Sequence, residues 1–172
     1  MKRIIILTAL FLILLPVIQT KAKTKVPELT FEETVETMVR EHKIMLDRLI
    51  AALEHRQEEI NLLAEVIYHE NWHTDKEHMA AYYTGAVVMN RVNSKAWPNS
   101  VKEVLYQRGQ YSTTKLFYTV ELPKECYEMA RDIYRNGTPD VPYDVVFQAT
   151  FKQGRGDWID PINGEHFCYG RA

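Results

Sequence analysis

The stretch Tyr68-His69-Glu70-Asn71-Trp72-His73 places a carboxylate between two imidazoles. It reads H-E-x-x-H, a spacing that puts both histidines on one face of a continuous helix, where they can hold zinc while the glutamate acts as a base. A glutamate can also act without a metal, because a glycosidic bond breaks when a carboxylic acid protonates its oxygen. The elements around Glu70 must decide between these two chemistries.

Two features of the sequence weigh against zinc. Thr74-Asp75-Lys76-Glu77 has the form of a capping box, which predicts that a new helix begins directly after His73 and that the earlier helix ends there or before. A catalytic zinc also needs a third protein ligand, and Lys76 and Met79 stand where the extended motif has glycine and histidine. We therefore expect no metal and no cofactor, and keep a zinc-dependent peptidase or amidase as the alternative.

Caps and apolar periodicity predict a mainly helical domain with a small β element near its C-terminal end. A capping box at Thr30-Phe31-Glu32-Glu33 opens a long amphipathic helix. Further helices are expected from Thr74 to about Asn93, from Ser100 to about Gly109, and from about Pro123 to Asn136 with Gly137 as its C-cap. Val145–Phe147 is expected to be extended, and Asn163-Gly164 is typical of a hairpin turn between residues 158–162 and 166–169.

The N-terminus has the layout of an export signal. Lys2 and Arg3 precede an apolar run from Ile4 to Ile18. We expect residues 1–22 to be either a signal peptide that is cleaved, which leaves a secreted protein, or a signal anchor that holds the chain in the membrane through residues 4–18. In both cases the rest of the chain is expected to be extracytoplasmic. Residues 23–60 are expected to form a linker and an amphipathic stalk helix, which either self-associates as a coiled coil or packs on its own domain. Residues 61–172 would form the catalytic domain.

The net charge bears on nucleic-acid binding, and the cysteine content bears on disulfide bonds. A net charge of −2 gives no strong attraction for nucleic acid, so we expect no nucleic-acid partner. Export would permit a disulfide, and Cys126 and Cys168 allow one bridge. Two free, buried thiols are the alternative, and the sequence leaves both open.

Several segments around Glu70 share their order with one enzyme family. LAEVIYHE ends in Glu70, GAVVMNRV closes in Asn90-Arg91-Val92, and Trp97-Pro98 precedes the turn Gly109-Gln110-Tyr111-Ser112. From about Leu62 to Tyr169 this pattern resembles the cell-wall hydrolases of the spore cortex-lytic enzyme family (SleB/CwlJ-like). The end Gly164-Glu165-His166-Phe167-Cys168 is similar to the family's Gly-x-His-x-aromatic ending. The segment Asn71-Trp72-His73 departs from the family, whose loop after the glutamate is shorter.

The resemblance implies an α+β, lysozyme-like or lytic transglycosylase-like fold. It also implies that the protein faces the cell wall and binds peptidoglycan glycan strands. It implies cleavage of the β-1,4 bond between N-acetylmuramic acid and N-acetylglucosamine, with Glu70 as the catalytic residue. Gln110, Tyr111 and His166 are the expected substrate-binding residues, whereas Asn90 and Arg91, at a helix end, are expected to be structural.

The residues around Glu70 favour a mechanism in which one carboxyl group acts without a second carboxylate. Val66, Ile67 and Tyr68 precede it, and an apolar setting raises a carboxyl pKa by desolvation. No second carboxylate is marked by a motif. A lytic transglycosylase needs none, because its glutamate acts first as acid and then as base toward the 6-hydroxyl of the muramic acid. Simple hydrolysis stays open, as does a non-catalytic wall-binding module.

Overall fold

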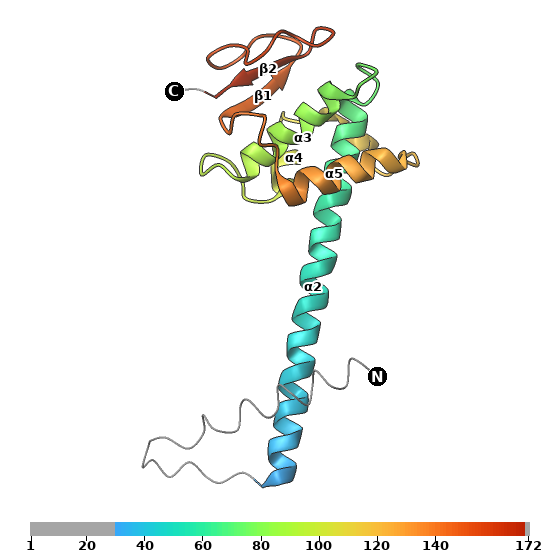
Figure 1. Ribbon diagram of the computed structural model, residues 1–172, viewed down its shortest axis with the longest axis vertical. Coiled ribbons are helices and arrows are strands. Elements are labelled where there is room, and N and C mark those ends of the chain that lie inside the picture. The colour runs from blue at the N-terminus through green and yellow to red at the C-terminus, as the bar shows by residue number, and fades with distance from the viewer. Residues whose placement is uncertain (1–29, 171–172) are drawn as a thin grey trace. The chain divides into compact units, whose positions relative to one another are not determined.

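The computed structural model describes residues 30–170 of the chain (Figure 1). Its elements are α2 (Phe31–Asn71), α3 (Met79–Val92), α4 (Val101–Leu105), the 3-10 helix η2 (Ser112–Leu116), α5 (Lys124–Asn136), β1 (Val145–Ala149) and β2 (His166–Tyr169). The mainly helical α+β class is thereby confirmed. The expected signal at residues 1–22 and the first part of the linker lie outside the described residues. None of the helices described is long and apolar enough to cross a membrane.

Helix α2 begins as the sequence predicts. The backbone N–H of Thr30 donates to Glu33 Oε2 over 2.8 Å, and Glu33 N–H donates back to Thr30 Oγ1 over 3.3 Å, which is a capping box. The helix then continues without a break as far as Asn71. The chain divides into two compact units between Met45 and Leu46, within this helix. Along residues 38–58 every side chain is exposed, so self-association of the stalk stays a prediction.

The core of the second unit begins directly after that exposed stretch. Ile60, Leu63 and Ile67 of α2 are at most 2% exposed and pack in one cluster with apolar residues of α3, α4 and α5. Helix α3 packs on α4, α5 and β1 (Figure 1). A Cβ at Gly85 of α3 would lie 2.6 Å from Ile133 Cδ1 of α5 and 3.0 Å from Ile67 Cδ1. This close approach of three helices fixes α3 against the end of α2.

The predicted start of the next helix is wrong by several residues. Helix α3 begins at Met79, and residues 72–77 form turns. The reason is that Asp75, and not Thr74, accepts hydrogen bonds from the backbone N–H groups at the start of α3. The Asp75 carboxylate accepts from the backbone N–H groups of Met79 (2.8 Å) and Ala80 (2.9 Å), whereas the Thr74 hydroxyl donates to Asn71 Oδ1 (2.7 Å). Asp75 therefore takes over the capping function that the sequence assigned to Thr74.

The remaining helices agree more closely with the sequence. Ser100 caps α4 and accepts from Glu103 N–H, although this helix already ends at Leu105 rather than near Gly109. Helix α5 ends at Asn136, and Gly137 follows with a positive φ of 73°, the backbone region that glycine reaches at least cost.

The small β element is an antiparallel pair of strands with one bulge. Val145 pairs with Tyr169 and Phe147 with Cys168, so Val146 is the extra residue. The predicted turn at Asn163-Gly164 is confirmed, since Ile162 and Glu165 exchange both backbone hydrogen bonds, at 3.0 and 2.9 Å. The ladder partner of β2 is nevertheless β1, and residues 158–162 form no strand. Both cysteines are free and buried.

A buried carboxylate of α2 holds the start of α4. Glu59, 4% exposed, accepts from the backbone N–H groups of Val101 (2.8 Å) and Lys102 (3.3 Å). We expect Glu59→Ala to lower the free energy of unfolding by about 2 kcal/mol, because two backbone donors lose a charged acceptor. Urea denaturation followed by circular dichroism measures this.

The neighbouring Glu58 supplies the control for that measurement. It pairs with the Lys102 ammonium at 2.8 Å on the surface, where ion pairs add little. Glu58→Ala should leave the denaturation midpoint close to that of the parent protein. Equal losses in the two variants would contradict the capping role of Glu59.

Candidate active site

Glu70 lies in the last turn of α2, one residue before the helix ends. The end is fixed by Asn71, whose side-chain amide donates to Thr84 Oγ1 of α3 (2.9 Å) and whose Oδ1 accepts from Thr74 (2.7 Å). Trp72 then leaves the helix and stacks on His78, with ring centroids 3.9 Å apart. The backbone beside Glu70 is therefore held by buried contacts on its C-terminal side.

The Glu70 carboxyl is half-buried and its pKa is raised. Burial is the largest cause, and the negative charge of Glu165 adds to it, while the Thr113 hydroxyl and His69 act in the opposite direction. Thr113, from η2, donates its hydroxyl hydrogen to Glu70 Oε1. One carboxyl oxygen is therefore oriented by the protein. A carboxyl group in this setting stays protonated to higher pH than an exposed glutamate, as a general acid requires.

A second glutamate lies deeper along the same helix. Glu65 is 1% exposed, and its Oε2 lies 3.3 Å from His69 Nε2 one turn later. The other side of the His69 ring stacks toward Phe117, with centroids 5.9 Å apart and planes 19° apart. His69 is therefore engaged with Glu65 and Phe117 inside the domain.

The two histidines of the H-E-x-x-H motif do not share a helical face. His69 is in α2, whereas His73 follows the end of that helix by two residues and its ring meets Tyr68 edge-on at 5.3 Å. The prediction that the helix ends before His73 is confirmed. Among residues 30–170, no three His, Cys, Asp or Glu side chains are grouped so that they could hold a metal ion.

Gln110 and Tyr111 lie directly before η2 and are held by Arg91 of α3. Gln110 is exposed, and its Oε1 accepts from Arg91 Nη1 over 2.9 Å. Tyr111 is 7% exposed; burial raises its pKa, and the charge of Glu70 adds to the rise. Arg91 is structural, as expected, but through neutral oxygens, since its Nε donates to the Val146 carbonyl over 2.7 Å.

The His166 ring is held by a carboxylate from the segment that precedes β2. Its Nδ1 lies 2.8 Å from Asp157 Oδ1, and Lys152 Nζ lies 2.9 Å from Asp157 Oδ2. Hydrogen bonds from Lys152 and His166 lower the pKa of Asp157 to about 2. The Asp157 carboxylate therefore orients the His166 ring, while the neighbouring Glu165 is the residue of this hairpin whose charge acts on Glu70.

The structure thus brings Glu70, Tyr111 and, through Arg91, Gln110 into one region and adds two residues that sequence reasoning missed. Thr113 and Glu165 carry no motif of their own. Thr113 is 43 residues from Glu70, and only the fold brings them together. The one available signal for Thr113 is that it directly follows the Gly109–Ser112 turn.

The raised pKa of Glu70 links its ionisation to stability. A group with a higher pKa in the folded than in the unfolded state stabilises the fold at low pH, and that contribution is lost as pH rises through the folded pKa. Glu70→Gln removes the ionisation. We expect the variant to melt at a higher temperature than the parent at pH 8, with the difference shrinking toward pH 4, in differential scanning calorimetry.

Glu54→Gln, at an exposed position of the same helix, is the control and should not change the melting temperature at either pH. A Glu70→Gln difference of the same size at both pH values would contradict the desolvation of Glu70.

The comparison with known families gives one match. Residues 76–166, just over half of the 172-residue chain, match the model of the family described as Cell Wall Hydrolase. The matched range runs from before α3 into β2; it contains Gln110, Tyr111, Thr113 and His166 but begins after Glu70. Searches of curated proteins and of solved structures give no match. The chain belongs to the cell wall hydrolase family, and this membership supports an enzyme that acts on the cell wall.

Proposed function

We propose that this protein cleaves the β-1,4 bond between N-acetylmuramic acid and N-acetylglucosamine in peptidoglycan, as a lytic transglycosylase with Glu70 as its acid and base. The observation that supports this most is the state of Glu70, a half-buried carboxyl group with a raised pKa and one oxygen bonded to Thr113.

The first step needs a proton at the glycosidic oxygen. Thr113 donates to Oε1 of Glu70, so we assign the transferred proton to Oε2. Transfer of this proton lets the bond to the leaving sugar break with an oxocarbenium-like transition state. The Glu70 carboxylate that results is stabilised by the Thr113 hydrogen bond and by His69, both of which favour the ionised form.

The second step uses the same carboxylate as a base. It takes the proton of the muramic acid 6-hydroxyl, whose oxygen closes onto the anomeric carbon and gives a 1,6-anhydro end. Glu70 is then protonated again and ready for another cycle. This sequence uses one carboxylate and returns it to its starting state.

Hydrolysis is the second candidate, and Glu165 is the observation in its favour. Its charge contributes to the raised pKa of Glu70, so a second carboxylate belongs to the electrostatic surroundings of the acid. A two-carboxylate glycosidase uses such a group to activate water or as a nucleophile. The two mechanisms differ in their product, since hydrolysis leaves a reducing sugar rather than an anhydro ring.

The three predicted substrate-binding residues have different roles in this proposal. Gln110 is exposed, and Arg91 holds its Oε1, which leaves the amide nitrogen to donate to a sugar. Tyr111 is buried, so it shapes the wall of the site rather than offering an open ring. His166, oriented by Asp157, would contact the sugar through Nε2.

The test is mass spectrometry of the fragments released from purified peptidoglycan by the protein without residues 1–22, beside its Glu70→Gln variant. We expect anhydro-muramyl ends that disappear in the variant. Reducing muramyl ends would assign hydrolysis instead. Released stem peptides with intact glycan strands would overturn the proposal in favour of a peptidase or amidase.

Thr113 gives a second prediction, on the pH dependence of the reaction. Its hydrogen bond lowers the Glu70 pKa, so Thr113→Val should raise that pKa further. An acid must be protonated, and activity is lost as pH rises through its pKa. The alkaline limb of the pH–rate profile is therefore expected to move to higher pH in Thr113→Val.

Thr114→Val is the matched control, because the Thr114 hydroxyl donates to the Tyr111 carbonyl at 3.0 Å instead of to Glu70. Its alkaline limb should coincide with that of the parent. A shift to lower pH in Thr113→Val would contradict the role of this hydrogen bond.

A further inference from the structure

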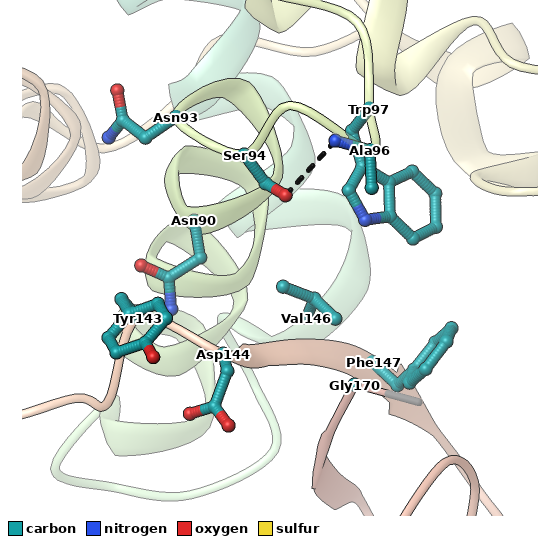
Figure 2. A pocket seen from close by; sticks show the side chains of 10 residues that line it. All are labelled: Asn90, Asn93, Ser94, Ala96, Trp97, Tyr143, Asp144, Val146, Phe147 and Gly170. Atoms are coloured by element: carbon teal, nitrogen blue, oxygen red, sulfur yellow. Dashed lines mark hydrogen bonds between the residues drawn. The ribbon is translucent and has the colours of Figure 1, made fainter. Parts of the chain in front are cut away.

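A hollow of about 570 Å³ lies between the end of α3 and strand β1 (Figure 2). Glu70 does not line it, so it is distinct from the position of the acid. Most of the side chains that line it are aromatic or carry an amide or a hydroxyl group: Trp97, Tyr143, Phe147, Asn90, Asn93 and Ser94.

The aromatic rings lie at both ends of this hollow. Figure 2 shows Trp97 and Phe147 at one end and Tyr143 at the other, with Val146 between them. The Trp97 and Phe147 ring centroids are 6.2 Å apart and the planes are 75° apart. Tyr143 is 84% exposed, so its ring is accessible to a ligand in the hollow. Spaced aromatic rings can pack on the C–H faces of successive sugar units.

The polar groups of the hollow are neutral and oriented. Asn90 Nδ2 donates to the carbonyls of Pro142 (2.9 Å) and Val145 (3.0 Å), which fixes the amide and leaves Oδ1 as an acceptor. The one carboxylate of the lining, Asp144, is paired with Arg155. No lysine or arginine of residues 30–170 lines the hollow. Such a lining suits the hydroxyl and acetamido groups of sugars.

One buried side chain, Arg91, contacts residues of both the hollow and the candidate active site. The Arg91 guanidinium carbon lies 4.4 Å from the Trp97 ring centroid and 5.4 Å from that of Tyr111. Its Nη1 holds Gln110, and its Nε holds the carbonyl of Val146, whose side chain lines the hollow. Gln110 and the Trp97 end of the hollow are therefore close neighbours, because both contact the same guanidinium group.

From these contacts we propose that the hollow is a glycan-binding subsite, which holds N-acetylated sugar units of the strand at a distance from the bond that is cut. This inference rests on the proposed function for the identity of the strand. Its purpose is to hold a long polymer while one bond is placed at Glu70, so that binding energy from remote sugars positions the reacting one.

The test measures binding of a peptide-free probe, a six-sugar oligomer of N-acetylglucosamine, in the Glu70→Gln protein. Adding Tyr143→Ala should weaken binding about three- to tenfold, the loss expected for one aromatic contact, in an NMR or calorimetric titration. Tyr143 is so exposed that its removal leaves the core intact. Phe151→Ala, which removes another exposed ring (63% exposed) outside the hollow, should bind like the parent.

With otherwise wild-type protein, Tyr143→Ala should also raise KM for long glycan strands. Equal oligomer affinity in the Tyr143→Ala and Phe151→Ala proteins, or no binding by any of them, would overturn the subsite. If the wild type cuts glycan strands and Tyr143→Ala changes neither affinity nor KM, the subsite fails alone. If Tyr143→Ala weakens oligomer binding but the wild type releases no glycan fragments, the proposed function fails and the subsite stands.

Discussion

The buried guanidinium of Arg91 is the interaction on which the arrangement of this domain depends. It is 3% exposed and joins three segments that are distant in sequence: α3, the Gln110-Tyr111 segment before η2, and the bulge of β1. A buried cation is costly unless its donors are used and its charge is met. Here carbonyl oxygens take the donors and the faces of Trp97 and Tyr111 meet the charge. The bulge matters because it frees the Val146 carbonyl from the ladder to accept from Arg91.

Glu70 depends on this framework through a balance of opposing effects. Burial and Glu165 favour the protonated carboxyl group, whereas Thr113 and His69 favour the carboxylate, and burial prevails. Each pKa unit corresponds to about 1.4 kcal/mol, so small movements of η2 or of the hairpin that carries Glu165 would change the proton affinity of the acid measurably. In the proposed reaction Glu70 gives up a proton and takes it back, and the opposing effects suit this because neither ionisation state is held too strongly.

The sequence predicts the elements whose signals are local and fails where tertiary contacts compete. The caps at Thr30, Ser100 and Gly137 involve neighbours within a few residues, and each lies where expected. Thr74 has an equally good local pattern, but Asn71 engages its hydroxyl because Asn71 is itself held by Thr84 across the helix pair. Among the candidate site residues, Glu70 is singled out by the family resemblance, which has a glutamate at the end of a helix. Its partner Thr113 could not, because no pattern in the chain records a contact across 43 residues.

The same reasoning explains why H-E-x-x-H arises in this chain without the geometry of a metal site. His69 is placed one turn after Glu65, so that a carboxylate buried in the core has an imidazole beside it at 3.3 Å. Asn71 then ends the helix by bonding to Thr84 and Thr74, and His73 is carried out of the helical register before it can face the same side as His69. The positions of the two histidines therefore have different causes: His69 lies beside Glu65 in the core, whereas His73 lies on the loop after the helix. Glu70 lies between them in the sequence, at the half-buried end of α2.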